Sequence, residues 1–169
     1  MERIERVRRE HLETVYQLLR SCATALLERG IEQWSDNYPH RDQVLADWRA
    51  QSLWGLWRGD ALLGTITLDE EQEAQYANIQ WQWTDQRVLV IHRLAVRPHV
   101  QGQGLGHRLA AWAEAYARRE AYGVIRLDAY SGNPHSQRLY KSRNYRRAPG
   151  ACWFDGRALP FWCWEKLIV

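Results

Sequence analysis

The chain has 169 residues, of which 46% are hydrophobic and 25% charged. This composition excludes an intrinsically disordered protein, because it supplies enough apolar surface for a packed core. Basic residues outnumber acidic ones by only 23 to 20, and the two signs are interspersed along the chain, which argues against nucleic-acid binding. The length predicts a single domain over residues 1–169.

The cysteines and the apolar segments indicate a cytoplasmic protein. Cys22, Cys152 and Cys163 form no CxxC pair and cannot all be joined in disulfides within the chain, which favours a reducing compartment and no metal site. No apolar segment approaches the roughly 18 residues of a membrane span. The charged start, Met1–Arg9, leads straight into an amphipathic segment and does not resemble a signal peptide. We therefore expect no membrane contact.

The first third of the chain predicts two helices and a hairpin. Apolar residues recur at helical spacing from Leu12 to Leu26, and Gly30 follows where a C-terminal cap belongs. A shorter helix is expected over 41–49. The segments 53–57 and 61–68 flank an Arg-Gly-Asp turn, which is typical of a β-hairpin.

Four further segments are expected to be strands. An acidic loop over 69–73 precedes residues 79–83, where apolar and polar residues alternate as in a strand. Residues 88–96 and 124–129 are largely apolar, which favours central strands. A last strand is expected near 161–168.

Two helices lie between these strands. One follows the glycine-rich turn at 101–106 and carries Leu105, Leu109, Trp112 and Tyr116 on one face. Asn133-Pro134 opens the other with a preferred N-cap residue and proline in the first helical position. Strands that alternate with helices indicate an α/β sheet with a parallel pair in its centre.

The glycine-rich turn is a candidate binding element for phosphate groups. Its glycines permit positive φ angles and close approach of the backbone to a ligand, and amides at a helix N-terminus favour a phosphate or pyrophosphate. A tight turn without a ligand is the alternative interpretation. No Gly-Lys-Ser/Thr follows, which excludes a P-loop, and the acidic ribose ligand of a dinucleotide fold is missing about 20 residues on.

Two motifs resemble those of the GNAT superfamily of acetyl-CoA-dependent N-acetyltransferases. The first is Leu94-x-Val96-x-Pro98 with Gln101-x-x-Gly104-x-Gly106, and the second is Asn133-Pro134-x-Ser136-x-x-Leu139-Tyr140. Their order and separation match the superfamily, which makes the pair more specific than either motif alone. The resemblance implies an α/β (α+β layered) fold with a mixed, mostly antiparallel sheet, a splayed central parallel strand pair and flanking helices.

The resemblance also implies how acetyl-CoA, the acyl donor, is held. Backbone groups of Leu94 and Val96 would pair with the pantetheine arm, and Asn133 and Ser136 would touch the pantetheine or the diphosphate. Backbone amides would bind the pyrophosphate along the whole turn, from Gln101, Gly102, Gln103, Gly104, Leu105 and Gly106.

Three residues are candidates for the chemistry. Tyr140 would face the thioester sulfur and donate a proton or hydrogen bond to the departing thiolate; a packed core tyrosine is the alternative. Asp128 is the first candidate base, because the matching position looks acidic in ribosomal-protein N-terminal acetyltransferases. His92 is the second candidate base, although a lone strand histidine is more often a packed, hydrogen-bonded residue.

Aromatic residues are expected to line the acceptor pocket, although for any single one a place in the core is the stronger interpretation: Trp34, Tyr38, Trp81, Trp83 and Tyr130. The acceptor is expected to be a primary amine of a small molecule or of a peptide or protein, and its identity stays open. Rival interpretations are a non-catalytic acyl-CoA sensor on the same fold and a structural or nucleic-acid-binding α/β module. A homodimer through the tryptophan-rich C-terminal strand also stays open.

Overall fold

The computed structural model describes all 169 residues, which fold as two compact units. The first unit consists of Met1–Leu68 and Arg93–Ala110, and the second of Asp69–His92 and Ala111–Val169. Strand β4 (Val88–Val96) and helix α3 (Leu105–Arg119) each run from one unit into the other.

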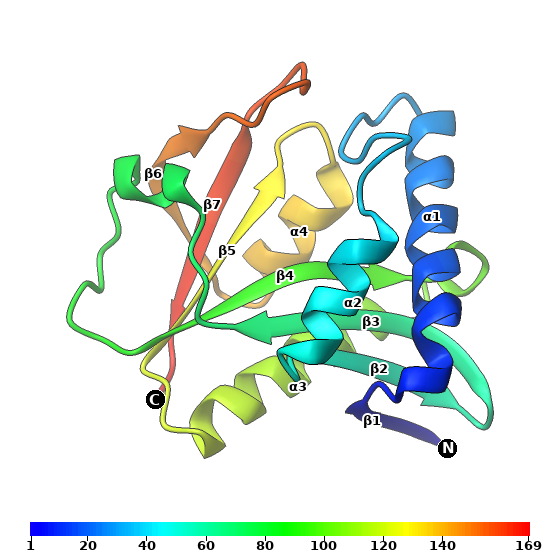
Figure 1. Ribbon diagram of the computed structural model, residues 1–169. Helices are drawn as coiled ribbons and strands as arrows, with labels where there is room; N and C mark the ends of the chain where they lie inside the picture. The colour runs from blue at the N-terminus through cyan, green and yellow to red at the C-terminus, as the bar shows by residue number, and fades with distance from the viewer. The chain divides into compact units, whose positions relative to one another are not determined.

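The first unit is a set of antiparallel strands with two helices beside them (Figure 1). The register pairs Ile4 with Leu56 and Gly55 with Thr65. Its elements are β1 (Glu2–Arg6), η1 (Arg9–His11), α1 (Leu12–Glu28), α2 (Arg41–Arg49), β2 (Leu53–Arg58), β3 (Ala61–Asp69) and η3 (Pro98–Val100), with Asp69 already in the second unit.

Helix α1 forms where the periodicity predicts it and buries the predicted apolar face. Val15 and Leu18 are fully buried, and Cys22 is 5% exposed. Gly30 has a φ of 74°, and its amide donates to the Leu27 carbonyl while the Ile31 amide donates to Leu26. The predicted C-terminal cap is therefore confirmed.

Strand β3 requires a glycine where β4 and α3 approach it. A Cβ on Gly64 would lie 2.9 Å from the Ala95 carbonyl oxygen and 3.0 Å from a Leu109 methyl group. Because Arg97 donates its amide to the Leu63 carbonyl at 2.8 Å, β3 and the end of β4 pair directly at this point.

The second unit is built from antiparallel and parallel strands, helix α4 and the second part of α3. Strand β5 pairs with β4 in parallel and with β7 in an antiparallel register, and β7 pairs with β6. Helix α4 packs on β5 (Figure 1). The elements are η2 (Ala74–Asn78), β5 (Val124–Tyr130), α4 (Pro134–Ser142), β6 (Arg146–Cys152) and β7 (Phe161–Leu167).

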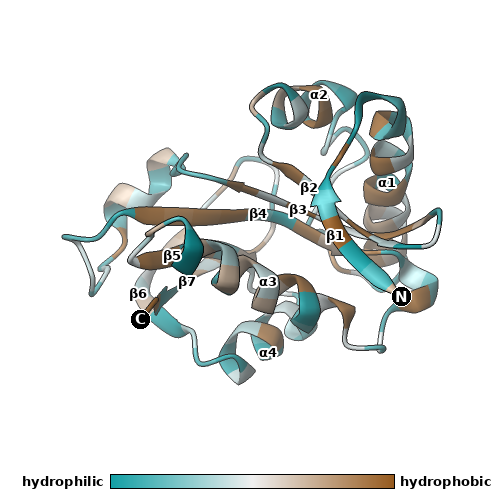
Figure 2. Cartoon of the chain, turned by 90° about the horizontal axis from the view of Figure 1, so that it is seen from below, coloured by the Kyte–Doolittle hydropathy of each residue, from teal (hydrophilic) through white to brown (hydrophobic).

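The strand order β1-β2-β3-β4-β5-β7-β6 confirms the predicted mixed, mostly antiparallel sheet. Its one parallel pair is β4 with β5. That ladder joins Val88–Val90 to Val124–Arg126 and ends there, although both strands continue. In the hydropathy view, apolar residues colour much of β4 brown, as the sequence predicts for a central strand (Figure 2).

Buried carboxylates hold the second unit together. Glu114 is 3% exposed and pairs with Arg143 at 2.7 Å and with Lys166. Glu165 is fully buried, accepts from Arg146 at 2.8 Å and receives the Gln82 amide at 2.9 Å. Each charge is paired, as buried charges require.

The strand predicted at 79–83 is wrong. At Gln82 and Trp83 the backbone bonds to side chains, since Glu165 accepts from both amides and Arg126 donates to the Trp83 carbonyl. Backbone groups satisfied in this way need no neighbouring strand, and the segment forms an irregular loop.

Two edge strands were not predicted from the sequence. The charged start, expected to lead directly into a helix, forms β1 first, and residues 146–152 form β6 despite Pro149 and Gly150. Both lie at the ends of the strand order, where charged residues, prolines and bulges are tolerated. The register of β6 indeed shifts between Ala148 and Cys152.

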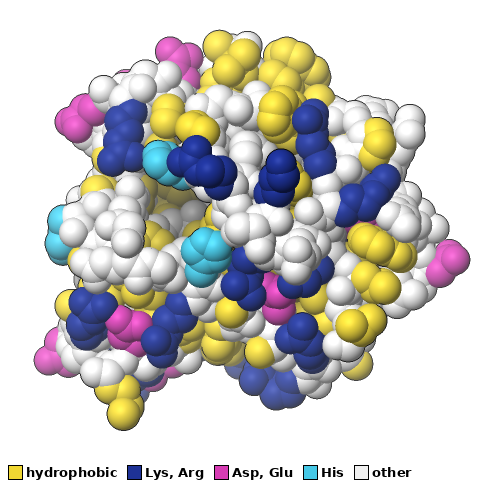
Figure 3. Space-filling view, turned by 180° about the vertical axis from the view of Figure 1, so that it is seen from behind, with side chains coloured by type: hydrophobic (Ala, Val, Ile, Leu, Met, Phe, Trp, Pro, Cys, Tyr) yellow, Lys and Arg dark blue, Asp and Glu magenta, His cyan; other side chains and the backbone are white.

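The surface carries interspersed charges. On the face that Figure 3 shows, Lys and Arg side chains are scattered among apolar and neutral ones and do not merge into one basic patch. None of the helices combines the length and apolar character that crossing a bilayer requires.

Candidate active site

The candidate base Asp128 lies in β5 and is bonded to a tyrosine that the sequence analysis did not single out. The Tyr76 hydroxyl donates to Asp128 Oδ2 at 2.6 Å. Tyr76 belongs to η2 and is 3% exposed. Burial, followed by the Asp128 carboxylate, raises the pKa of Tyr76 well above its usual value, so this phenol is a hydrogen-bond donor at any assay pH.

Tyr140 lies near Asp128 and has an available hydroxyl. It is 6% exposed in α4. Burial, followed by the charge of the Asp128 carboxylate, raises the pKa of Tyr140, and no group of the protein forms a hydrogen bond with its hydroxyl. A neutral phenol with a free O–H therefore lies close to a carboxylate within the second unit.

Helix α4 is fixed to the end of β5, and this fixes Tyr140. The Asn133 side chain accepts from the amides of His135 at 3.2 Å and Ser136 at 3.4 Å, which confirms the predicted N-cap. Gln137 donates to the carbonyls of Ala129 and Tyr130, and its Oε1 accepts from Trp164 at 2.9 Å. Asn133 and Ser136, predicted to contact acetyl-CoA, thus both take part in the cap.

His92, the second candidate base, forms a dyad with a carboxylate. Its Nε2 lies 2.8 Å from Asp69 Oδ1 and 3.1 Å from the Glu71 carbonyl oxygen. A carboxylate partner of this kind orients an imidazole. The sequence pairs neither Asp69 nor Glu71 with His92 by any pattern.

In the first unit, the predicted phosphate-binding turn exposes unbonded amides. Gly102 and Gly104 have φ angles of 84° and 79°, and nothing lies within 4 Å of where their Cβ atoms would be. The amides of Gly102, Gln103 and Gly104 donate to no acceptor of the protein. Those of Leu105 and Gly106 begin α3, whose first turn has no intrahelical acceptors for its amides.

The end of β4 carries the backbone groups that the family resemblance assigns to the pantetheine arm. Arg97 donates its amide to β3. Because the backbone N–H and C=O groups of successive strand residues point to opposite sides within the sheet, those of Leu94 and Val96 point away from β3. The Val96 carbonyl, however, already accepts from Gln101 Nε2 at 2.9 Å and from the Cys22 thiol at 3.2 Å. The Val96 carbonyl is therefore occupied within the protein.

The family model for the acetyltransferase (GNAT) family matches residues 12–145. The chain belongs to this family. The matched segment contains both motifs, the glycine-rich turn at 101–106 and Asn133–Tyr140. Acetyl-CoA is the acyl donor of the GNAT acetyltransferases. Among curated proteins, no sequence matches this GNAT chain.

Solved structures share the fold of this GNAT chain at low sequence identity. A GNAT-family acetyltransferase from Streptococcus agalactiae superposes with a TM-score of 0.81 at 19% identity, over 98% of this chain and 95% of that one. A protein from Salmonella typhimurium, assigned as an acetyltransferase and solved with its cofactor acetyl-CoA, gives 0.74 at 17%, over 100% and 95%. The ribosomal-protein-S18-alanine N-acetyltransferase from Escherichia coli gives 0.70 at 15%, over 99% and 94%.

The aromatic residues predicted to line an acceptor pocket lie in several environments. In the first unit, Trp34 is 7% exposed and belongs to the core, while the Tyr38 hydroxyl accepts from Arg93 at 3.0 Å. In the second unit, the Trp81 ring lies against Tyr76 with ring centroids 5.2 Å apart and an interplanar angle of 57°. The other two are Trp83, which is half-buried, and Tyr130, which is 3% exposed and packs edge-on against Phe161.

A buried ion pair at the bend of β4 is a feature that the sequence did not reveal. Arg93 has a φ of 47° within the strand. Its guanidinium bonds to Asp47 Oδ2 at 2.7 Å, and the same oxygen accepts from Thr67 at 3.0 Å. The side chains of Arg93 and Asp47 are 11% and 8% exposed, so α2, β3 and β4 meet at one desolvated carboxylate.

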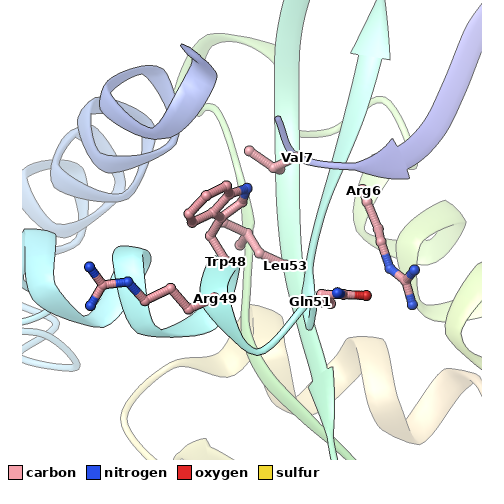
Figure 4. A pocket seen from close by; sticks show the side chains of 6 residues that line it. All are labelled: Arg6, Val7, Trp48, Arg49, Gln51 and Leu53. Atoms are coloured by element: carbon pink, nitrogen blue, oxygen red, sulfur yellow. The ribbon is translucent and has the colours of Figure 1, made fainter. Parts of the chain in front are cut away.

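An open hollow of about 380 Å³ lies elsewhere in the first unit (Figure 4). The Trp48 ring lies beside Val7 and Leu53, while the Arg49 side chain points away from them. The lining consists of Arg6, Val7, Trp48, Arg49, Gln51 and Leu53. None of these residues belongs to the predicted catalytic or acetyl-CoA-binding sets.

Proposed function

We propose that this GNAT chain transfers the acetyl group of acetyl-CoA to a primary amine of a small molecule or of a peptide or protein. The observation that carries the proposal is the buried Tyr140 hydroxyl, which bonds to no group of the protein and whose pKa is raised in part by the charge of the Asp128 carboxylate. A free donor and a carboxylate that interact are what amine acetylation requires, since one proton leaves the amine and the departing sulfur needs a donor.

The turn at 101–106 fits the donor. Acetyl-CoA carries a pyrophosphate, and the amides of Gly102, Gln103 and Gly104 are three exposed donors in sequence that bond to no acceptor of the protein. We assign the same role to Leu105 and Gly106, and assign the backbone of Leu94 and the Val96 amide to the pantetheine arm. Gln101 acts differently, because its amide already donates to the Pro98 carbonyl at 3.3 Å and its side chain holds the Val96 carbonyl.

We assign the chemistry to two residues of the second unit. Asp128 accepts the proton of the attacking amine, directly or through water. Tyr140 donates a hydrogen bond to the sulfur as negative charge develops there. Because burial and Asp128 raise the pKa of Tyr140, the phenol stays protonated. It therefore acts chiefly as a hydrogen-bond donor that stabilises the departing thiolate, whose conjugate thiol has a pKa of about 8.5. His92 is the second candidate base.

The test compares Tyr140→Phe with Tyr145→Phe. Tyr145 is a matched control, because its hydroxyl is buried without a partner and its ring packs on Tyr140 at 5.4 Å. With free-thiol detection, we expect Tyr140→Phe to lower kcat by about 10- to 100-fold and to leave the KM for acetyl-CoA unchanged. Equal activity of the two variants would remove Tyr140 from the mechanism.

A further inference from the structure

Beyond the family motifs, the structure contains one polar contact that bears directly on the candidate base. It joins Tyr76, in the connection between β3 and β4, to Asp128 in β5, which is 52 residues away in sequence. At 2.6 Å, the O···O distance falls in the range of charge-assisted hydrogen bonds. The Tyr76 phenol is the donor, and a hydrogen bond donated to a carboxylate favours its ionised form.

Trp81 holds both the ring and the backbone of Tyr76. The Trp81 ring lies against the Tyr76 ring, and Trp81 Nε1 donates to the Tyr76 carbonyl at 3.0 Å. Trp81 is held in turn by the Arg126 guanidinium, 4.4 Å above its ring centroid. The tryptophans predicted to line a pocket therefore include one that supports Tyr76.

The loop that carries Tyr76 is fixed at further points. Arg126 donates to Gln72 Oε1 and to the Trp83 carbonyl, each at 2.8 Å. The Gln80 amide donates to Pro149 of β6 at 3.0 Å. These bonds to regular strands support the loop and with it the position of Tyr76.

We infer that Tyr76 is a positioning residue for the reaction, which fixes the orientation of the Asp128 carboxylate and holds it ionised, ready to accept the proton of the attacking amine. The inference rests on the proposed function. A general base acts only within hydrogen-bond reach of the proton that it takes, and the terminal torsion of an aspartate is otherwise broad. The bond from Tyr76 restricts that torsion.

Other ionisable groups surround this contact and enter any pH dependence. They are the Tyr140 phenol of α4, the thiol of Cys163, which is paired with Asp128 in the β5–β7 register, and the thiol of Cys152 at 3.2 Å from it. His92 lies on the neighbouring strand β4. Because the hydrogen bond with the Cys152 thiol and burial raise the pKa of Cys163, the Cys163 thiol stays neutral in the range in which a carboxylate titrates.

The experiment is Tyr76→Phe, which keeps the ring against Trp81 and removes only the hydroxyl, with Tyr145→Phe as the matched control. We expect kcat/KM for the amine to fall about tenfold, with an unchanged KM for acetyl-CoA. Tyr76→Phe also removes a hydrogen bond that favours the ionised Asp128 carboxylate. The acid limb of the kcat/KM profile is therefore expected to move to higher pH, by about one unit. A purely structural tyrosine would not move this limb.

Two further measurements separate this inference from the proposed function. In an Asp128→Asn background, Tyr76→Phe is expected to have no added effect on the rate, because the residue acts through Asp128. A ¹³C NMR titration of the Asp128 carboxyl needs no acceptor and is expected to show a higher midpoint in Tyr76→Phe than in the wild type.

If Tyr76→Phe matches Tyr145→Phe in both the pH profile and the NMR titration, the inference is overturned while acetyl transfer stands. The same conclusion follows if Asp128→Asn retains full activity. Absence of acetyl transfer from every variant and from the wild type would instead overturn the proposed function, and with it the catalytic part of this inference.

Discussion

The ion pair at the bend of β4 gives the sharpest prediction for stability. Asp47 is 7% exposed and accepts from Arg93, Thr67 and Gln43, the last at 3.0 Å. Asp47→Ala leaves a desolvated guanidinium and a buried hydroxyl without their acceptor. Removal of one partner of a buried pair costs about 3–5 kcal/mol, which is a large share of a typical unfolding free energy of about 5–15 kcal/mol.

The assay is urea unfolding followed by tryptophan fluorescence, together with thermal melting, for which this loss corresponds to a Tm about 6–20 °C lower. Asp47→Asn keeps an oxygen acceptor and is expected to lose less. Glu13→Ala is the matched control, since it removes an ion pair with Arg41 in which both side chains are more than half exposed, and it is expected to leave the midpoint nearly unchanged. If Asp47→Ala and Glu13→Ala unfold at the same urea concentration, the reasoning about the buried pair is refuted.

Three further predictions concern α4, the glycine turn and the buried phenols. Asn133→Ala removes the N-cap of the helix that carries Tyr140 and is expected to destabilise the protein by about 1 kcal/mol in urea unfolding; no change would mean that the cap does not hold α4. Gly104→Ala puts a side chain at a φ of 79°, so it is expected to cost about 1–2 kcal/mol and to weaken acetyl-CoA in calorimetry, whereas unaltered binding would speak against the turn as the phosphate site. The raised pKa values of Tyr76, Tyr140 and Tyr145 mean that the folded state keeps protons that the unfolded state loses above about pH 10; stability is therefore fully present below that pH and is lost as the pH rises further. An ultraviolet titration in which every tyrosine ionises near pH 10 while the protein stays folded would contradict this.

Local patterns were sufficient to predict the elements that bury an apolar face. The periodicity from Leu12 to Leu26 and the apolar segment 88–96 gave α1 and β4, because one periodicity dominates in each. The Asn133-Pro134 pair gave the start of α4, since capping depends on neighbouring residues alone.

The sequence could not predict contacts that depend on distant partners. The alternation at Ile79, Trp81 and Trp83 looks like a strand, but Glu165 takes the amides of that segment from more than 80 residues away. The same is true of the site, where Tyr140 follows from a motif and Tyr76 does not. Only the fold brings Tyr76 to Asp128, and no local pattern marks it.

The most direct test of acetyl transfer follows both products at once. The purified protein is incubated with acetyl-CoA and a panel of polyamines, amino acids, aminoglycosides and peptides, and free thiol and acetylated amine are quantified, the latter by mass spectrometry. The account predicts at least one amine for which acetylated product and thiol appear in equal amounts and depend on the Tyr140 hydroxyl. Binding of acetyl-CoA without acetylation of any amine would contradict it and would favour an acyl-CoA sensor on the same fold.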